Sequence, residues 1–172
     1  VFPHGPTRPV TINGGHVMRA WYDILGTDIA RREDEAGLRA SQALVEELIA
    51  RERARGIPAS RIVLGGFSQG CAMTLMAGLR HGERLAGLLG MSGYLPLADT
   101  TAAERSTANA DVPIFLAHGR ADPVIALARA TASRDALQAL GYPVEWHDYP
   151  MPHSVCAQEI ADINRWLLTV LA

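Results

Sequence analysis

The sequence contains no lysine, and its 16 basic residues are all arginines that are spread along the chain. With 18 acidic residues against them, the formal net charge is -2. Nucleic-acid-binding domains usually carry a clustered basic patch or stripe. We therefore expect no nucleic-acid partner.

Cysteine is scarce: only Cys71 and Cys156 occur, without a CxxC motif or a Cys/His cluster. This excludes a disulfide framework and gives no set of zinc ligands, so we expect no metal. The two residues are expected to pack as small hydrophobes. Cys71 also has an alternative, because it lies in the first turn of a predicted helix, whose dipole can lower the pKa of a thiol.

Long hydrophobic runs are also missing, since none approaches the ~20 residues that a membrane span requires. The first residues show no pattern of a secretory leader. The length of 172 residues suits one domain, residues 1–172. We expect a soluble, cytoplasmic protein. The opening Val1–Pro3 resembles the end of a buried strand, so we also expect this domain to lack N-terminal strands that lie upstream.

Short apolar runs alternate with helical patterns along the chain. A run such as Ile62–Leu64 is typical of a strand buried on both faces. The alternation predicts an α/β fold with a parallel sheet flanked by helices. The expected strands are 62–64, 85–91, 113–118 and 144–149; the expected helices are 39–55, 71–77, 124–140 and a terminal helix containing 160–170, with part of 97–110 also helical.

The pentapeptide Gly66-Phe67-Ser68-Gln69-Gly70 follows one of these strands and precedes a helix. Ser68 could serve only as the N-cap of that helix. The same G-x-S-x-G context is, however, what a nucleophile elbow requires, because the sharp turn exposes the serine hydroxyl. The motif predicts a nucleophilic serine if an imidazole and a carboxylate are available to activate it.

An acid and a histidine follow later predicted strands, where sites of parallel sheets form. Asp122 comes after the strand ending at His118, and His153 lies in a proline-bordered loop after the last strand. Asp122 could instead cap the next helix. The order Ser68, Asp122, His153 matches that of an α/β-hydrolase catalytic triad. His118 and His147 are set aside because they lie in or at the end of predicted strands.

Several linked segments together resemble the phospholipase/carboxylesterase family, from Phe2 to the terminal helix. The quoted segments are Arg8–Gly15, Trp21–Asp23, Gly66–Gly70, Ser92–Pro96, His118–Asp122 and Tyr149–His153. The resemblance implies an α/β-hydrolase fold and hydrolysis of short to medium acyl esters and thioesters, without metal or organic cofactor. It also implies that the main-chain N–H of Gln69 contributes to the oxyanion hole. The H-G-L-G type loop that supplies the other donor in the family is not found in this sequence.

Trp21, Tyr22, Tyr94 and Leu95 lie in segments that resemble the substrate groove of the family, although core packing would explain each equally well. We expect a serine carboxylesterase that acts on a small-molecule acyl ester and can form a homodimer. The alternatives are an acyl-protein thioesterase or lysophospholipase, or a catalytically impaired fragment on the same fold.

Overall fold

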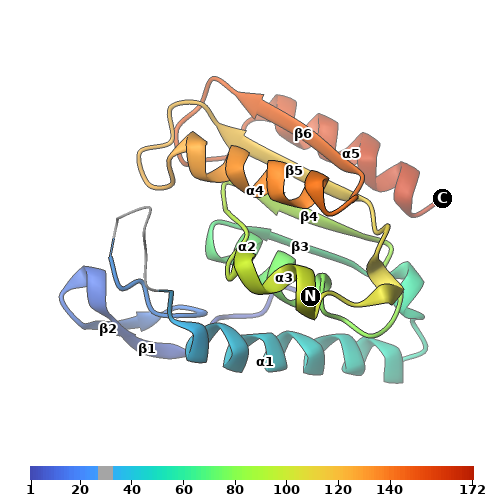
Figure 1. Ribbon diagram of the computed structural model, residues 1–172, viewed down its shortest axis with the longest axis horizontal. Coiled ribbons are helices and arrows are strands. Elements are labelled where there is room, and N and C mark those ends of the chain that lie inside the picture. The colour runs from blue at the N-terminus through green and yellow to red at the C-terminus, as the bar shows by residue number, and fades with distance from the viewer. Residues whose placement is uncertain (27–32) are drawn as a thin grey trace.

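A computed structural model describes residues 1–26 and 33–172 of the chain. Its centre is a parallel sheet of four strands in the order β3-β4-β5-β6 (Figure 1). The strands are β3 (Val63–Phe67), β4 (Gly87–Met91), β5 (Ile114–Gly119) and β6 (Val144–Tyr149). The predicted parallel sheet is confirmed. Because the strands are parallel, the chain leaves each of them at the same edge, and the loops that follow lie side by side.

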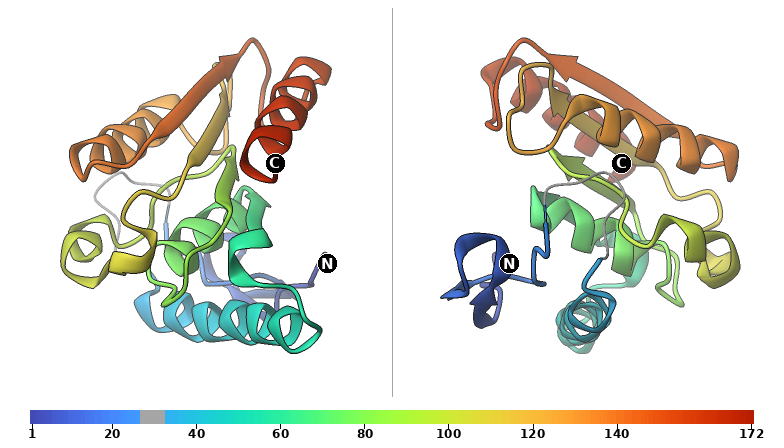
Figure 2. Two further views of the ribbon diagram at one scale, coloured as in Figure 1. Left: turned by 90° about the vertical axis from the view of Figure 1, so that its right-hand side faces the viewer. Right: turned by 60° about the vertical axis from the view of Figure 1, so that its left-hand side comes forward.

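Helices cover both faces of the sheet, so that α4 and α5 lie on opposite sides of it (Figure 2). The helices are α1 (Glu35–Ala54), α2 (Gln69–Gly78), α3 (Ala98–Glu104), α4 (Leu127–Ala139) and α5 (Ala157–Val170). Short 3-10 turns occur in the connections at Thr11–Asn13, Ala59–Arg61 and Thr107–Asn109. The mixture of helix and loop predicted for residues 97–110 corresponds to α3 and the last of these turns.

The alternation of side chains along the buried strands divides the core into two main clusters. Leu88, Ile114 and Leu116 face α2 and α4, whereas Leu89 and Phe115 face α5. Helix α2 is buried on every side from Cys71 to Gly78, as its continuous apolar sequence predicts. A third cluster joins α2 to α1. The sheet is thereby fixed from both faces, which gives the loops at its carboxyl edge a rigid base.

Two predictions about the beginning of the sheet are wrong. Ile62–Leu64 is predicted to be buried on both faces, but β3 lies at one edge of the sheet and is only half-buried, with Gly65 exposed. Val1–Pro3 forms no strand, and the side chains of Val1 and Phe2 are 81% and 101% exposed. These residues instead line a groove of about 750 Å³ beside β3. Pairing on one side only explains why an apolar strand stays partly open to solvent.

The helix predicted over 124–140 begins later than expected, at Leu127. The amides of Val124 and Ile125 donate to the Oδ1 atom of Asp122, at 2.8 and 2.9 Å. Ala126 follows with φ of -57° and ψ of 138°, which is not a helical conformation, and it separates this turn from the helix. The helix therefore starts three residues later than expected.

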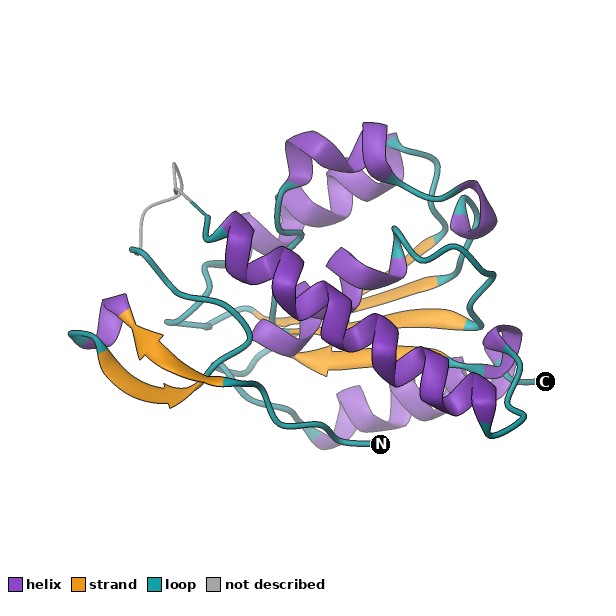
Figure 3. Ribbon diagram, turned by 90° about the horizontal axis from the view of Figure 1, so that it is seen from below, coloured by secondary structure: helices purple, strands orange, loops and turns teal. Residues whose placement is uncertain are grey.

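An antiparallel hairpin of β1 (Thr7–Val10) and β2 (His16–Arg19) stands apart from the main sheet, to one side of the long helix α1 (Figure 3). The sequence gives no clear signal for these strands, because both are short and β1 carries a proline. Gly14 and Gly15 close the hairpin with φ of 66° and 78°, values that glycine adopts without strain. Within the two described ranges, no helix has the length and apolar character needed to cross a membrane.

Candidate active site

Ser68 occupies the sharp turn between β3 and α2. Its φ of 57° and ψ of -118° are unusual for a residue other than glycine. Its amide donates to the carbonyl of Met91 at 2.9 Å, which ties the turn to β4. Although Ser68 lies at the N-cap position of α2, its hydroxyl makes no capping hydrogen bond. The alternative of a simple helix cap is therefore wrong, and the hydroxyl is directed elsewhere.

The hydroxyl of Ser68 lies 3.0 Å from Nε2 of His153, and Nδ1 of the same imidazole lies 2.7 Å from Oδ2 of Asp122. The structure thus joins the three predicted residues in one chain of hydrogen bonds, although they are up to 85 positions apart in sequence. The side chain of Asp122 is fully buried and that of His153 is 16% exposed. Each residue comes from the carboxyl end of a different strand.

Two neighbouring loops hold the acid and the histidine in register. The amide of Arg120 donates to the carbonyl of Tyr149 at 2.8 Å, and the amide of Ala121 donates to that of Met151 at 3.1 Å. A Cβ on Gly119 would lie 2.3 Å from the carbonyl oxygen of Pro152, so the loops approach at a distance that only glycine permits. The sequence puts Asp122 and His153 each in a loop after a strand, and the pairing of these two loops fixes the distance between the two side chains.

Asp122 remains an anion in this setting. Burial alone raises the pKa of its carboxyl group, but hydrogen bonds from the amide of Ile125, the imidazole of His153 and the amide of Val124 outweigh burial and lower the pKa below its ordinary value. An anionic Oδ2 accepts the Nδ1 proton of His153. Nε2 of the neutral imidazole is then free to accept a proton from Ser68.

The other histidines that the structure describes near the sheet have different partners. His147 in β6 pairs with Glu145 at 2.8 Å and stacks on Phe115, so it does not approach Ser68. His118 lies behind Asp122, with Nε2 at 3.4 Å from Oδ2. The sequence predicts that His118 lies at the end of a strand, outside the site. Its position four residues before the acid was the one available signal.

The side chain of Gln69 joins the serine turn to a distant segment. Its carboxamide accepts from the amide of Trp21 at 2.8 Å and donates to the carbonyl of Tyr22 at 3.0 Å. As the first residue of α2, Gln69 also has a main-chain N–H that no intrahelical carbonyl can accept. That N–H adjoins Ser68, where the sequence predicts an oxyanion donor.

Most of the residues expected to form a substrate groove pack in the core instead. Tyr22, Tyr94 and Leu95 are 3%, 6% and 5% exposed, and the hydroxyls of the two tyrosines lie 2.8 Å apart. Arg129 covers the ring of Tyr94 at 3.3 Å from its centroid. Only Trp21 stays half-exposed, and it lines the groove beside β3. Core packing therefore explains the first three residues.

Cys71 is also a packing residue. Its side chain is buried, and a Cβ on Gly90 or Gly93 would lie 2.6 Å from its sulfur. Burial raises the pKa of the thiol to about 12, so the predicted alternative of a thiol pKa lowered by the helix dipole is wrong. Cys156 is half-buried, and neither cysteine is in a disulfide.

A parallel sheet with a serine on a strand-to-helix turn, followed by an acid and a histidine after later strands, defines the α/β-hydrolase class. The chain belongs to the phospholipase/carboxylesterase family, whose sequence model matches residues 1–171. The resemblance and fold class predicted from the sequence are confirmed.

Similar proteins include acyl-protein thioesterases and plant structures. The chain is 45% identical to acyl-protein thioesterase 1 of Neurospora crassa, over 97% of this chain and 71% of the relative. It is also 45% identical to acyl-protein thioesterase 1 of Schizosaccharomyces pombe, over 99% of this chain and 77% of that relative. The crystal structure of Arabidopsis thaliana SOBER1 superposes with a TM-score of 0.95 at 28% identity, covering 100% of this chain and 83% of that one. The crystal structure of Zea mays acyl-protein thioesterase 2 superposes with a TM-score of 0.88 at 31% identity, covering 99% of this chain and 80% of that one.

These likenesses identify the chain as a hydrolase of the esterase and thioesterase type. They favour the alternative of a thioesterase over the generic carboxylesterase that the sequence predicts.

Proposed function

We propose that the protein is a serine hydrolase that removes acyl groups from thioesters, and from oxygen esters of the same acids, through an acyl-Ser68 intermediate. The observation that carries this proposal is the continuous line of hydrogen bonds from Ser68 through His153 to Asp122. The similarity to acyl-protein thioesterases supports an acylated protein thiol as the substrate class.

Acylation begins when Nε2 of His153 takes the proton of the Ser68 hydroxyl and Oγ attacks the acyl carbonyl carbon. The main-chain N–H of Gln69 donates to the oxyanion that develops on the carbonyl oxygen. The imidazolium, stabilised by Asp122, then gives its proton to the departing sulfur or oxygen as the bond to the acyl carbon breaks. A thiol or an alcohol leaves, and the acyl group remains on Ser68.

Deacylation repeats these steps with water as the nucleophile. His153 takes a proton from the water, the hydroxide adds to the acyl carbon, and the proton returns to Oγ of Ser68 as the carboxylic acid leaves. The free serine is regenerated. Each proton transfer uses the one imidazole that contacts both Ser68 and Asp122.

A pair of substrates with the same acyl group, one a thioester and one an oxygen ester, tests the proposal. We expect both to be hydrolysed, with kcat/KM higher for the thioester, and we expect Ser68→Ala to abolish both activities. Ser106→Ala is the matched control, because Ser106 caps a remote 3-10 turn. Turnover that persists in Ser68→Ala would refute the mechanism; a strong preference for the oxygen ester would favour the carboxylesterase alternative.

A cytoplasmic location and a homodimer stay predictions. The half-buried edge of β3 supports self-association, because an edge strand with one free side can pair with another chain. Light scattering of the purified protein and fractionation of the source cells are the measurements that check the two predictions. The organisation as a single domain likewise stays a prediction, which limited proteolysis would test.

A further inference from the structure

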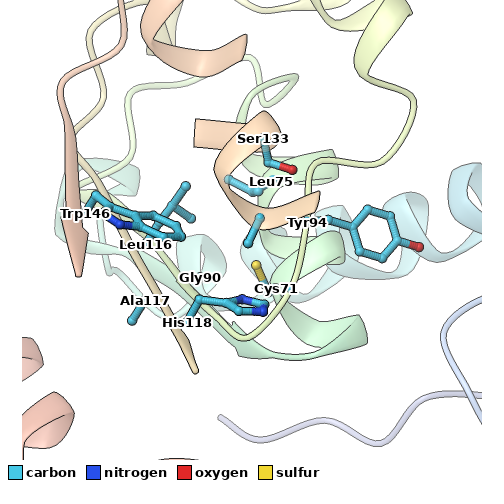
Figure 4. Close-up of a pocket in the computed structure, with 11 residues that line it drawn as sticks. Cys71, Leu75, Gly90, Tyr94, Leu116, Ala117, His118, Ser133 and Trp146 are labelled. Atoms are coloured by element: carbon cyan, nitrogen blue, oxygen red, sulfur yellow. The ribbon is translucent and has the colours of Figure 1, made fainter. Parts of the chain in front are cut away.

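His118 is a buried histidine that the proposed mechanism does not use. It is the penultimate residue of β5, and its side chain is fully buried. Figure 4 shows its ring beside Cys71, at a small cavity of about 10 Å³ that Tyr94 and Ser133 also line. A cavity of this size has room for no more than one water molecule. Burying a polar ring without hydrogen bonds costs free energy, so the hydrogen bonds of His118 have to be accounted for.

The two nitrogens of the His118 ring have different surroundings. Nε2 lies 2.9 Å from the carbonyl oxygen of Ile125 and 3.4 Å from Oδ2 of Asp122. Both atoms are acceptors, so Nε2 must carry the proton. Nδ1 is buried and has no hydrogen-bond partner among the residues that the structure describes. A proton on Nδ1 would be buried without an acceptor among these residues, so the hydrogen-bond geometry places the proton of the ring on Nε2.

The contact with Ile125 connects His118 to the turn that holds Asp122. The amide of Ile125 donates to Oδ1 of Asp122, while its carbonyl accepts from His118. The turn is therefore attached to Asp122 through one group of Ile125 and to β5 through another. Within the described ranges, the charged or titratable groups in contact with Asp122 are the imidazoles of His118 and His153.

We propose that His118 is a positioning residue for the Asp122–His153 pair: its single Nε2 proton fixes the Asp122–Ile125 turn and the orientation of Oδ2. This inference rests on the proposed function only in assigning a catalytic purpose to that pair. His118 does not contact the reacting atoms. It acts by keeping the carboxylate aligned with Nδ1 of His153, on which the orientation of the base depends.

The tautomer can be measured in the unmodified protein. Long-range ¹H–¹⁵N correlation spectra should show His118 protonated at Nε2 and unprotonated at Nδ1 throughout the pH range of enzymatic activity. A proton on Nδ1 with a bare Nε2 would overturn the proposal, because Nε2 could then donate neither to Ile125 nor to Asp122. This measurement needs no catalysis, so its outcome is independent of whether the protein proves to be a thioesterase.

Two substitutions separate positioning from simple packing. The carboxamide nitrogen of Gln can reach the place of Nε2, whereas that of Asn reaches only the place of Nδ1. We expect His118→Asn to lower kcat about 10- to 100-fold with KM little changed, as small misplacements of catalytic groups do. His118→Gln should restore most of the loss. His147→Asn is the control, because His147 in β6 is a half-buried histidine that pairs with Glu145.

Rates are to be expressed per active site, titrated with a fluorophosphonate. Unchanged kcat in His118→Asn would overturn the proposal, as would equal losses in the Asn and Gln variants. A lower melting temperature with unchanged kcat per titrated site would show a purely structural role. If neither variant folds, the tautomer in the unmodified protein decides. If Ser68 of the unmodified protein does not react with the fluorophosphonate, the proposed function has failed rather than the proposal about His118.

Discussion

Gly66 and Gly70 approach so closely that a Cβ on Gly66 would lie 2.2 Å from the carbonyl carbon of Gly70. The two glycines border the serine turn, and the approach allows β3 to pass directly into α2. No rearrangement of a flexible side chain could relieve this contact, because the obstructing atoms are main-chain atoms. The first glycine of the G-x-S-x-G motif is thus required by steric contact.

Gly66→Ala should therefore distort the turn, lower the free energy of unfolding by roughly 1–3 kcal/mol as overpacking does, and reduce esterase activity sharply. Gly70→Ala is the matched control, because a Cβ there meets nothing within 4 Å. It should leave both properties almost unchanged. Denaturant titration and initial rates measure the two effects; equal behaviour of the two variants would contradict the steric explanation.

Replacing Asp122 by Asn should keep the fold and lower kcat by about 10⁴-fold, because an amide no longer selects the imidazole tautomer that activates serine. His153→Gln should be at least as damaging, while His147→Gln should retain full activity, since His147 pairs with Glu145. Steady-state kinetics on one ester substrate compare the three. If His147→Gln were inactive and His153→Gln active, the base would be misassigned.

Glu104, at the end of α3, joins two arginines from elsewhere in the fold. Its carboxylate lies 2.8 Å from Arg39 and 2.7 Å from Arg80. Hydrogen bonds from Arg39 and then Arg80 lower the pKa of Glu104 to about 2. A lowered folded-state pKa means that the carboxylate stabilises the fold above its unfolded pKa, and that this contribution disappears as the pH falls toward 2.

Glu104→Gln should therefore lower the free energy of unfolding at pH 7 by about 1 kcal/mol, a value kept small because Glu104 is 30% exposed and the pair is screened by solvent. The difference between the two proteins should shrink as the pH is lowered from about 4.5 toward 2. Urea titrations across this range would show it. If the difference in the free energy of unfolding grew at low pH, it would contradict the lowered pKa of Glu104.

The two cysteines should react differently with maleimide. Burial raises the pKa of Cys71 to about 12, whereas Cys156 is half-buried. In the native protein we expect modification of Cys156 well before Cys71, and modification of both in denaturant. Peptide mapping of briefly treated samples gives the ratio. Early labelling of Cys71 would show that the region behind the serine turn opens readily.

Much of the site could be predicted from sequence because its signals are local. The glycines and the preceding apolar strand point to Ser68 as the candidate nucleophile, and the loops after later strands point to Asp122 and His153 as its candidate partners. Contacts between distant segments could not be read in this way. The carboxamide of Gln69 meets the main chain of Trp21 and Tyr22 across 48 and 47 positions, and no periodic pattern encodes such a contact.

The same distinction holds for the fold. Strand β6 matches its predicted range of 144–149, because alternation and apolar runs are properties of neighbouring residues. The half-exposed state of β3 depends on its place at the edge of the sheet, which its own sequence does not record. The late start of α4 depends on the non-helical conformation of Ala126, which the apolar pattern around it does not indicate.

The most direct test of the central claim is to trap the acyl-enzyme. The protein is mixed with a slowly hydrolysed acyl thioester, quenched in acid within the first turnover, digested and mapped by mass spectrometry. We predict that the acyl mass is found on the peptide containing Ser68, and that it disappears on longer incubation as water completes the reaction. Acylation of another residue, or turnover without any acylated Ser68, would contradict the mechanism.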